Sequence, residues 1–256
     1  MIVKFLRDTW LIYQRQMTLM LRTPIWILVG IAQPITYLFL FTPFLKPALA
    51  SMGADSYADA FQIYVPGLLV VMCLYGGLWA GFGLLGELRA GIVERARVTP
   101  VSRSALLLGR ALRDVTSMLL QALIITLMAL PFGLKAHVGD LVIAYILLFL
   151  IGLMATAISY DITLSVKNES ALGPTINTIA QPLALLAGVL LPLALAPLWM
   201  RQVAWWNPFS WATDGVRALF NGRLGDAIVW QGLTITAVVA VATVLISARL
   251  YNRQVR

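Results

Sequence analysis

Six long apolar stretches, separated by short polar segments, constrain the fold of this chain more than any other feature. Each is about 20 residues long, the length at which an α-helix crosses the hydrocarbon core of a bilayer. Of the 256 residues, 60% are hydrophobic and 12% are charged, about half the charge of an ordinary soluble domain. The sequence therefore predicts an all-α membrane protein. The predicted spans are residues 25–45, 61–82, 106–132, 138–159, 173–195 and 229–248.

Residues 1–22 precede the first span and have the pattern of a separate amphipathic helix. Apolar residues recur at helical spacing on one face, and basic residues lie opposite them. This pattern favours an interface helix on an anionic membrane surface, followed by one transmembrane domain over residues 23–256. The alternative is a soluble helix packed on a partner protein. The apolar face contains Ile2, Leu6, Trp10, Tyr13, Met17 and Met20, and the polar face contains Lys4, Arg7, Asp8, Arg15 and Arg22.

Residues 83–103 interrupt the apolar pattern with a charge at every second or third position. As a helix from about Leu84 to Val98, this segment has an apolar stripe opposite a charged face. Pro100 disfavours helical geometry at Thr99 and ends the helix there. A charged amphipathic helix between two spans is expected to lie at the membrane surface and to offer its polar face to a partner.

The distribution of basic residues predicts the orientation of the chain in the membrane. With six spans, 14 Lys and Arg residues fall on the side of the two termini and five on the other side. Such an excess marks the cytoplasmic side. The sequence therefore predicts a multi-pass protein of the cytoplasmic (inner) membrane, with both termini and residues 83–103 in the cytoplasm.

Residues 196–228, between the fifth and sixth spans, are rich in tryptophan and interrupted by prolines. Tryptophan concentrates at the boundary between lipid and water. We expect an outer re-entrant segment of short helices here. Its candidate residues are Trp199, Asn207, Pro208, Asp214 and Arg217.

Several classes of function lack their chemistry in this sequence. The net charge of +8 does not predict nucleic-acid binding, because basic loops account for it in a membrane protein. No G-x-x-x-x-G-K-[ST] phosphate loop is present, and neither the single Cys73 nor the single His137 belongs to a metal-binding or catalytic motif. Few ionisable residues fall at the centre of the spans, which disfavours a proton-coupled carrier. We expect no metal site and no catalytic residue in this chain.

A few polar and small residues inside the spans are candidates for function. Gln33, Tyr37, Asn177 and Gln181 are candidates for a substrate path, since Asn177 and Gln181 share a helical face and Tyr37 lies one turn after Gln33. The alternative is hydrogen bonding between helices. Gly77-x-x-x-Gly81 is typical of close helix packing.

Three blocks of sequence resemble the permease subunits of type-2 ABC transporters, in the branch of the daunorubicin and nodulation-factor exporters. The first is Arg15 to Pro24, which is similar to the interface helix and its entry into the first span. The most specific block is Glu87-x-x-x-Gly91-x-x-Glu94-x-x-x-x-Thr99-Pro100-Val101-Ser102-Arg103, which resembles the family's E-x-x-x-G-x-x-E…T-P-V-S-R pattern. The third runs from Pro197 to Gly222 and resembles the outer re-entrant segment. Asp161 departs from the family pattern, in which an apolar residue ends the fourth span.

The resemblance implies a role for the segment between the second and third spans. In these permeases it is a coupling helix, which fits a groove on a separate ATP-binding subunit. Two permeases, identical or homologous, and two such ATPases form the transporter, with ATP and magnesium bound in the ATPase. In this sequence the coupling role falls to Glu87, Arg89, Gly91, Glu94, Arg95, Arg97, Thr99 and Pro100.

The sequence and the resemblance together predict the permease subunit of an ATP-driven exporter. The chain itself is not expected to be an enzyme, and its partners are the ATPase, a second permease and membrane lipid. Apolar spans with few polar groups favour an amphipathic, lipid-linked or drug-like cargo. Two alternatives stay open, a membrane-embedded enzyme or assembly factor and an ion-coupled carrier.

Overall fold

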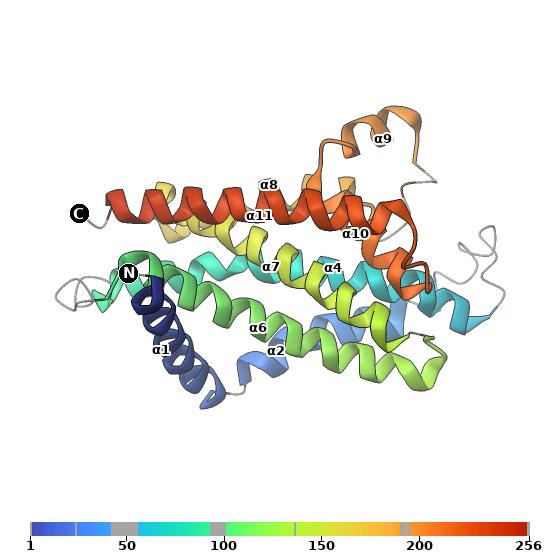
Figure 1. Ribbon diagram of the computed structural model, residues 1–256, viewed down its shortest axis with the longest axis horizontal. Helices are drawn as coiled ribbons and strands as arrows, with labels where there is room; N and C mark the ends of the chain where they lie inside the picture. Colours follow the sequence, from blue (N-terminus) through green and yellow to red (C-terminus); the bar gives the residue numbers. More distant parts are fainter. Residues whose placement is uncertain are drawn as a thin grey trace.

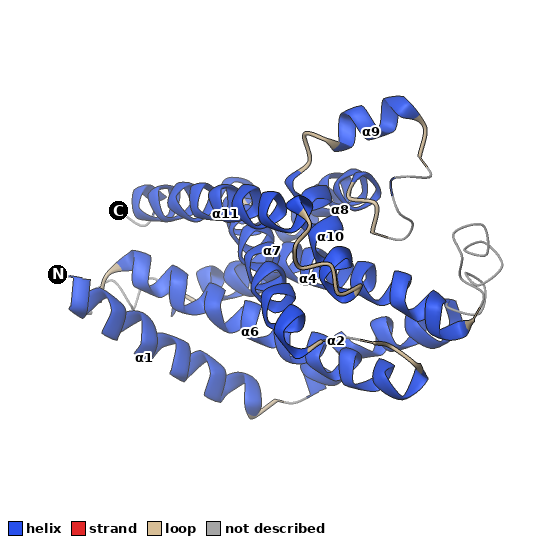
Figure 2. Ribbon diagram, turned by 45° about the vertical axis from the view of Figure 1, so that its right-hand side comes forward, coloured by secondary structure: helices blue, strands red, loops and turns tan. Residues whose placement is uncertain are grey.

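The protein is described from a computed structural model that covers residues 2–23, 25–41, 56–92, 101–135, 137–189, 193 and 196–254. These residues form helices joined by short turns, and no strand occurs among them (Figure 2). Four helices are long and apolar enough to cross a membrane: α4 (Tyr57–Arg89), α6 (Arg103–Ala129) with the short η3 (Leu130–Phe132), α7 (Val138–Val166) and α11 (Ala227–Gln254). This result confirms the all-α class and the predicted second, third, fourth and sixth spans as apolar helices.

The predicted first and fifth spans correspond to shorter helices. The first begins with α2 (Ile25–Thr36), which continues as the π-helical η1 (Tyr37–Phe41). The fifth begins with α8 (Glu169–Leu186). Neither reaches the length and apolarity of the four long helices within the described residues. Their predicted ends, near Leu45 and Leu195, lie outside those residues.

Both chain termini lie at the same end of the helical bundle (Figure 1). The last turn of α4, the first turn of α6 and the junction of α7 with α8 lie at this end, which we call the terminal end. The start of α4, the turn between η3 and α7, and the small helices α9 (Leu198–Ala204) and α10 (Pro208–Phe220) lie at the opposite end. Helix α1 (Ile2–Leu21) is inclined to the bundle at the terminal end.

Helix α4 is the centre of the bundle and packs most closely against α7. A Cβ atom at Gly77 would lie 2.6 Å from the Cβ of Ala155, and one at Gly81 would clash with Ser159 and Thr163. The N–H of Gly81 donates to Ser159 Oγ at 3.0 Å, and that hydroxyl donates to the carbonyl of Leu78. The glycine pair thus permits close helix packing, as the sequence pattern predicts.

Helix α1 lies along α6 and leaves part of its apolar surface uncovered. A Cβ at Gly109 of α6 would lie 2.8 Å from Ile12 and 2.9 Å from the carbonyl of Thr9, so the two helices are in contact. Leu6 and Trp10 remain more than half exposed. One side of α1 therefore packs on its own chain, while an apolar side is available to lipid or to a partner.

Candidate functional site

Capping residues determine where the helices around the candidate site begin. Ser56 and Asp59 form a capping box at the start of α4, in which each side chain accepts a hydrogen bond from the backbone N–H of the other residue. Ser102 caps α6, since its Oγ accepts from the N–H of Ala105 at 3.2 Å. Asn207 caps α10 directly before Pro208. These local signals fix the starts of helices on which much of the site is built.

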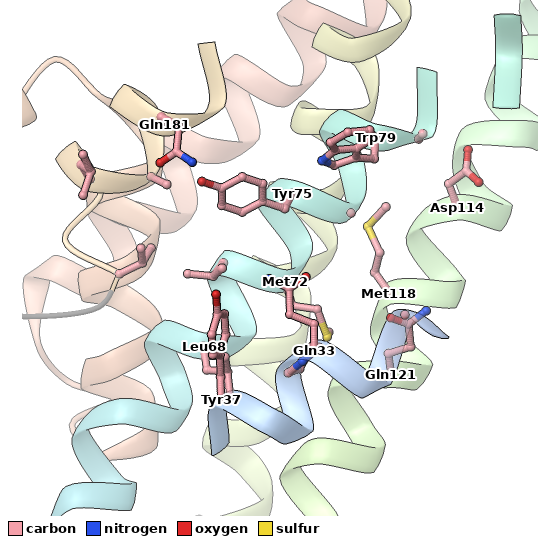
Figure 3. A pocket seen from close by; sticks show the side chains of 18 of the residues that line it. Gln33, Tyr37, Leu68, Met72, Tyr75, Trp79, Asp114, Met118, Gln121 and Gln181 are labelled. Atoms are coloured by element: carbon pink, nitrogen blue, oxygen red, sulfur yellow. The ribbon is translucent and has the colours of Figure 1, made fainter. Parts of the chain in front are cut away.

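A cavity of about 1410 Å³ lies between α2, η1, α4, α6 and α8, with a few residues from the segment that leads into α9 (Figure 3). From Tyr64 to Gly83, the cavity follows α4 over 20 residues, which span about 28 Å at a rise of 1.5 Å per residue. That length is close to the thickness of the hydrocarbon core, about 30 Å. The cavity therefore extends along most of the part of α4 that would cross a membrane.

Three of the four residues predicted for a substrate path line this cavity. Gln33 and Tyr37 enter it from α2 and η1, and Gln181 enters it from α8. Asn177 lies one turn before Gln181 and is exposed, but it does not line the cavity. The structure thus brings residues from distant parts of the chain together and separates two that share a helical face.

Sequence reasoning did not identify the aromatic side of the cavity. Tyr64, Tyr75, Trp79 and Phe82 line it from one side of α4. Trp79 and Phe82 stack, with ring centroids 5.0 Å apart. Successive rings are eleven, four and three residues apart, a spacing that places them on one face of a helix. A helix that packs into a core has the same spacing, so the sequence does not distinguish the two cases.

A network of charged side chains joins the helices near the terminal end. Glu87 at the end of α4 forms an ion pair with Arg110 of α6, and Gln16 of α1 donates to Glu87 Oε1 at 3.1 Å. Arg110 is almost fully buried, while 23% of the Glu87 side chain is exposed. One carboxylate thus holds three helices together, whereas the family resemblance implies a role for Glu87 in coupling to the ATPase.

A second part of this network reaches the cavity. Arg113 Nη1 lies 3.1 Å from Asp114 Oδ1, and Tyr160 of α7 donates to Asp114 Oδ2 at 2.7 Å. Arg113 and Asp114 also line the cavity. Both residues lie in the first part of the predicted span 106–132. Tyr160, the partner of Asp114, lies 46 residues further along the chain, so only the tertiary structure shows this contact.

The predicted coupling segment is described only in part. Helix α4 continues through Glu87 and Arg89, so the start of the predicted surface helix is the last turn of a spanning helix. Gly91 ends it with φ of 66°, a conformation that favours glycine. Arg89 forms an exposed ion pair with Glu169 at the start of α8. Glu94, Arg95, Arg97, Thr99 and Pro100 lie outside the described residues.

The predicted outer segment is held by hydrogen bonds to backbone carbonyl groups. Asn207 Nδ2 donates to the carbonyl of Leu183 at 2.9 Å, and Arg217 Nη2 donates to that of Val189 at 3.0 Å. Burial lowers the pKa of Arg217 to about 10, although the nearby carboxylate of Asp214 raises it. Because this pKa is still well above 7, the guanidinium is charged at neutral pH. Trp199 is largely exposed on α9. Asn207 and Arg217 therefore anchor this segment to the chain around α8.

Asp161, the departure from the family pattern, joins α7 to α11. Ser247 Oγ lies 2.6 Å from Asp161 Oδ1 and 2.9 Å from the carbonyl of Ala157. Helix α7 also continues to Val166, seven residues beyond the predicted end of the fourth span. Asp161 is thus a helix-pairing residue within α7.

Apolar spanning helices around a long cavity are the architecture of a membrane transport protein, and comparison with known families agrees. Residues 7–221 match the ABC-2 type transporter family, to which the chain belongs. The chain is therefore a membrane transporter permease, and the predicted resemblance to the permeases of this family is confirmed.

Individual relatives are also permeases. The chain is 25% identical over 221 residues to the putative transport permease ycf38 of Cyanophora paradoxa, covering 85% of this chain and 75% of the relative. It is 24% identical over 233 residues to the daunorubicin resistance ABC transporter permease protein DrrB1 of Streptomyces coeruleorubidus, covering 90% and 81%. It is 22% identical over 198 residues to the probable multidrug ABC transporter permease YbhR of Escherichia coli, covering 75% and 52%. These relatives are named as transport permeases, not as enzymes.

Proposed function

We propose that this chain is the membrane subunit of an ATP-driven exporter. The observation that carries the proposal is the match of residues 7–221 to the ABC-2 type transporter family, a family that implies an ABC ATPase partner and usually a dimeric arrangement. Two ATPase subunits bind ATP and magnesium, and a second permease, identical or homologous, completes the assembly. The chain contributes the membrane path and no catalytic residue.

In this proposal the membrane path is the cavity beside α4. Its length along α4 and its mixture of aromatic and amide side chains fit an amphipathic, lipid-linked or drug-like cargo that leaves the cytoplasm. Two relatives, the daunorubicin resistance permease and the probable multidrug permease, bear names that agree with drug-like cargo. Gln33, Tyr37 and Gln181 are the proposed contacts.

The coupling route begins in residues 84–103. We place the ATPase contact on the part of this segment after Gly91, because Glu87 and Arg89 are paired within the chain. Motion of the ATPase would move the end of α4. The ion pairs of Glu87 and Arg89 would carry this motion to α6 and α8, and the hydrogen bond between Gln16 and Glu87 would carry it to α1. The Arg113–Asp114 pair on α6 then reaches the cavity.

The proposed topology has six spans in the cytoplasmic membrane, with both termini in the cytoplasm. Helix α2 and helix α8 begin the first and fifth spans. The start of α8 lies at the terminal end, as alternating spans require (Figure 1). Helix α1 lies in the cytoplasmic interface, with Leu6 and Trp10 towards lipid.

Reversing two charges in the coupling segment tests the proposal. Glu94→Arg with Arg95→Glu preserves net charge but reverses the local pattern, so we expect the co-expressed ATPase to be lost on purification of the permease and ATP-dependent export to fall at least tenfold. The matched control is Arg223→Glu with Asp226→Arg, which reverses an exposed pair, 3.2 Å apart, at the opposite end. Unchanged ATPase association and export in the first variant would contradict the proposed coupling.

A further inference from the structure

The cavity lining is divided between aromatic and amide side chains. One side of α4 supplies aromatic rings, including Tyr75 and Trp79, while three glutamines come from three different helices. In Figure 3, Gln181 and Tyr75 point toward one another across the cavity, and Gln33 and Gln121 lie on its other walls. A molecule in this cavity would meet flat apolar faces and hydrogen-bonding groups at the same time.

The hydrogen-bonding capacity of two of these amides is unused. The side chains of Gln33 and Gln181 are exposed and form no hydrogen bond with the part of the chain that the structure describes. In contrast, Gln121 Nε2 donates to Ser117 Oγ at 3.3 Å. A primary amide without a partner is costly in the low-dielectric interior of a membrane. Acyl chains do not satisfy it, so these two groups favour a ligand that carries hydroxyl or carbonyl groups.

The charged groups of the cavity are already committed to one another. Among the described lining residues, the formal charges belong to Arg113 and Asp114, whose nearest atoms are 3.1 Å apart. The second oxygen of Asp114 accepts from Tyr160 at 2.7 Å. An ionic ligand would have to compete with this pair, which favours an uncharged one.

We infer that the cavity binds an uncharged molecule that combines a flat ring system with several hydroxyl or carbonyl groups. This inference rests on the proposed function and narrows its cargo. The rings lie against Tyr75 and Trp79 of α4, and the polar groups bond to Gln33 and Gln181. The volume of about 1410 Å³ exceeds the 300–1,000 Å³ of an ordinary drug site, so the cavity has room for a ligand larger than a typical drug.

Binding to the isolated permease in nanodiscs tests this inference, with protein-free nanodiscs as the baseline. The first probe is naringenin at pH 6, which is mostly uncharged and carries hydroxyl and carbonyl groups on a nearly flat fused ring system. The others are anthracene, which has rings but no polar group, and ethidium and anilinonaphthalene sulfonate, which are charged. We expect naringenin to bind at least tenfold more tightly than each of the others. Equal or tighter binding of anthracene or of a charged probe would overturn the inference.

Paired variants on α8 locate the binding. Gln181→Leu should weaken naringenin binding about tenfold, the loss expected for one hydrogen bond, and leave anthracene within twofold. Asn177→Leu, one turn away and outside the cavity, should leave both probes within twofold. Trp79→Leu should weaken both probes. Equal effects of Gln181→Leu and Asn177→Leu on naringenin would place the probe elsewhere and contradict the inference.

Export is measured separately, in cells that also express the ATPase. The expected binding pattern without ATP-dependent export would count against the proposed function alone. Export without that binding pattern would count against the cavity chemistry alone. Gln33→Leu serves as a second variant, because Gln33 is the other proposed hydrogen-bonding contact. Both glutamines are exposed, so each variant should fold, and an unchanged unfolding temperature confirms this.

Discussion

The two ends of the bundle are held together by different kinds of bond. Near the terminal end, ion pairs such as Glu87–Arg110 and Arg89–Glu169 join separate helices. At the opposite end, side-chain amides bond to backbone groups. Gln62 of α4 donates to the carbonyls of Lys135 and Phe220 and accepts from the N–H of Lys135 at 2.9 Å.

This difference shows which end is suited to respond to charge. A buried ion is costly without its partner, whereas a neutral amide that loses its partner costs less. We propose that the ATPase docks at the terminal end. The two ion pairs there differ in strength, because Glu87–Arg110 is largely buried and Arg89–Glu169 is exposed. At the opposite end, the ion pairs join residues three positions apart, such as Arg223 and Asp226, while contacts between distant parts of the chain are hydrogen bonds to backbone carbonyl groups. This end should therefore respond less to salt.

The largest expected effect is the loss of the buried pair at the terminal end. Arg110→Met leaves the carboxylate of Glu87 with Gln16 as its remaining partner, and we expect about 3 kcal/mol of destabilisation. Equilibrium unfolding in mixed detergent micelles measures the change. Glu87→Gln combined with Arg110→Met removes the uncompensated charge and should recover most of the loss. A double variant as unstable as the single one would show that the pair is not the cause.

A smaller loss is expected when the neutral clasp at the opposite end is removed. Gln62→Leu deprives Lys135 and Phe220 of their side-chain partner, which we expect to cost about 2 kcal/mol in the same unfolding assay. Gln202→Leu, at an exposed position of α9, is the control and should change stability by less than about 0.5 kcal/mol. The Gln62 effect should be the same at low and high salt. A strong salt dependence would remove the contrast between the two ends.

The smallest effect is expected at the exposed ion pair. Half or more of each side chain is exposed in Arg89 and Glu169, so Arg89→Gln should cost less than about 1 kcal/mol. The loss should fall further in 1 M salt, where exposed charges are screened. Glu169→Gln should have the same effect. A loss as large as that of Arg110→Met would mean that exposure does not distinguish the two pairs.

Much of the fold follows from local sequence patterns. Apolar length predicts the four long helices, and the glycine pair in α4 predicts a close helix contact. Helix ends were less predictable. Helix α4 continues beyond the predicted span through Glu87 and Arg89, because their charges find partners on α6 and α8.

The candidate site was predictable only as a set of separate residues. Gln33, Tyr37 and Gln181 were identified as polar or amphipathic side chains in apolar spans, and they meet in one cavity. Tyr75 and Trp79 were not identified, because an aromatic row on a helix has the same spacing whether it faces a cavity or a core. Arg113 and Asp114 were visible in the sequence, but their access to the cavity was not.

By itself, the sequence determined that this chain is a helical membrane protein, because apolar length and periodicity are local properties. Only the tertiary structure decided which polar residues serve the cavity and which join helices. Asn177 and Gln181 are both amides on α8, one turn apart, yet only Gln181 lines the cavity. Glu87 lies on the charged face of its segment, yet it is paired with Arg110. The physical reason is that the rotation and neighbours of each helix depend on packing against distant parts of the chain.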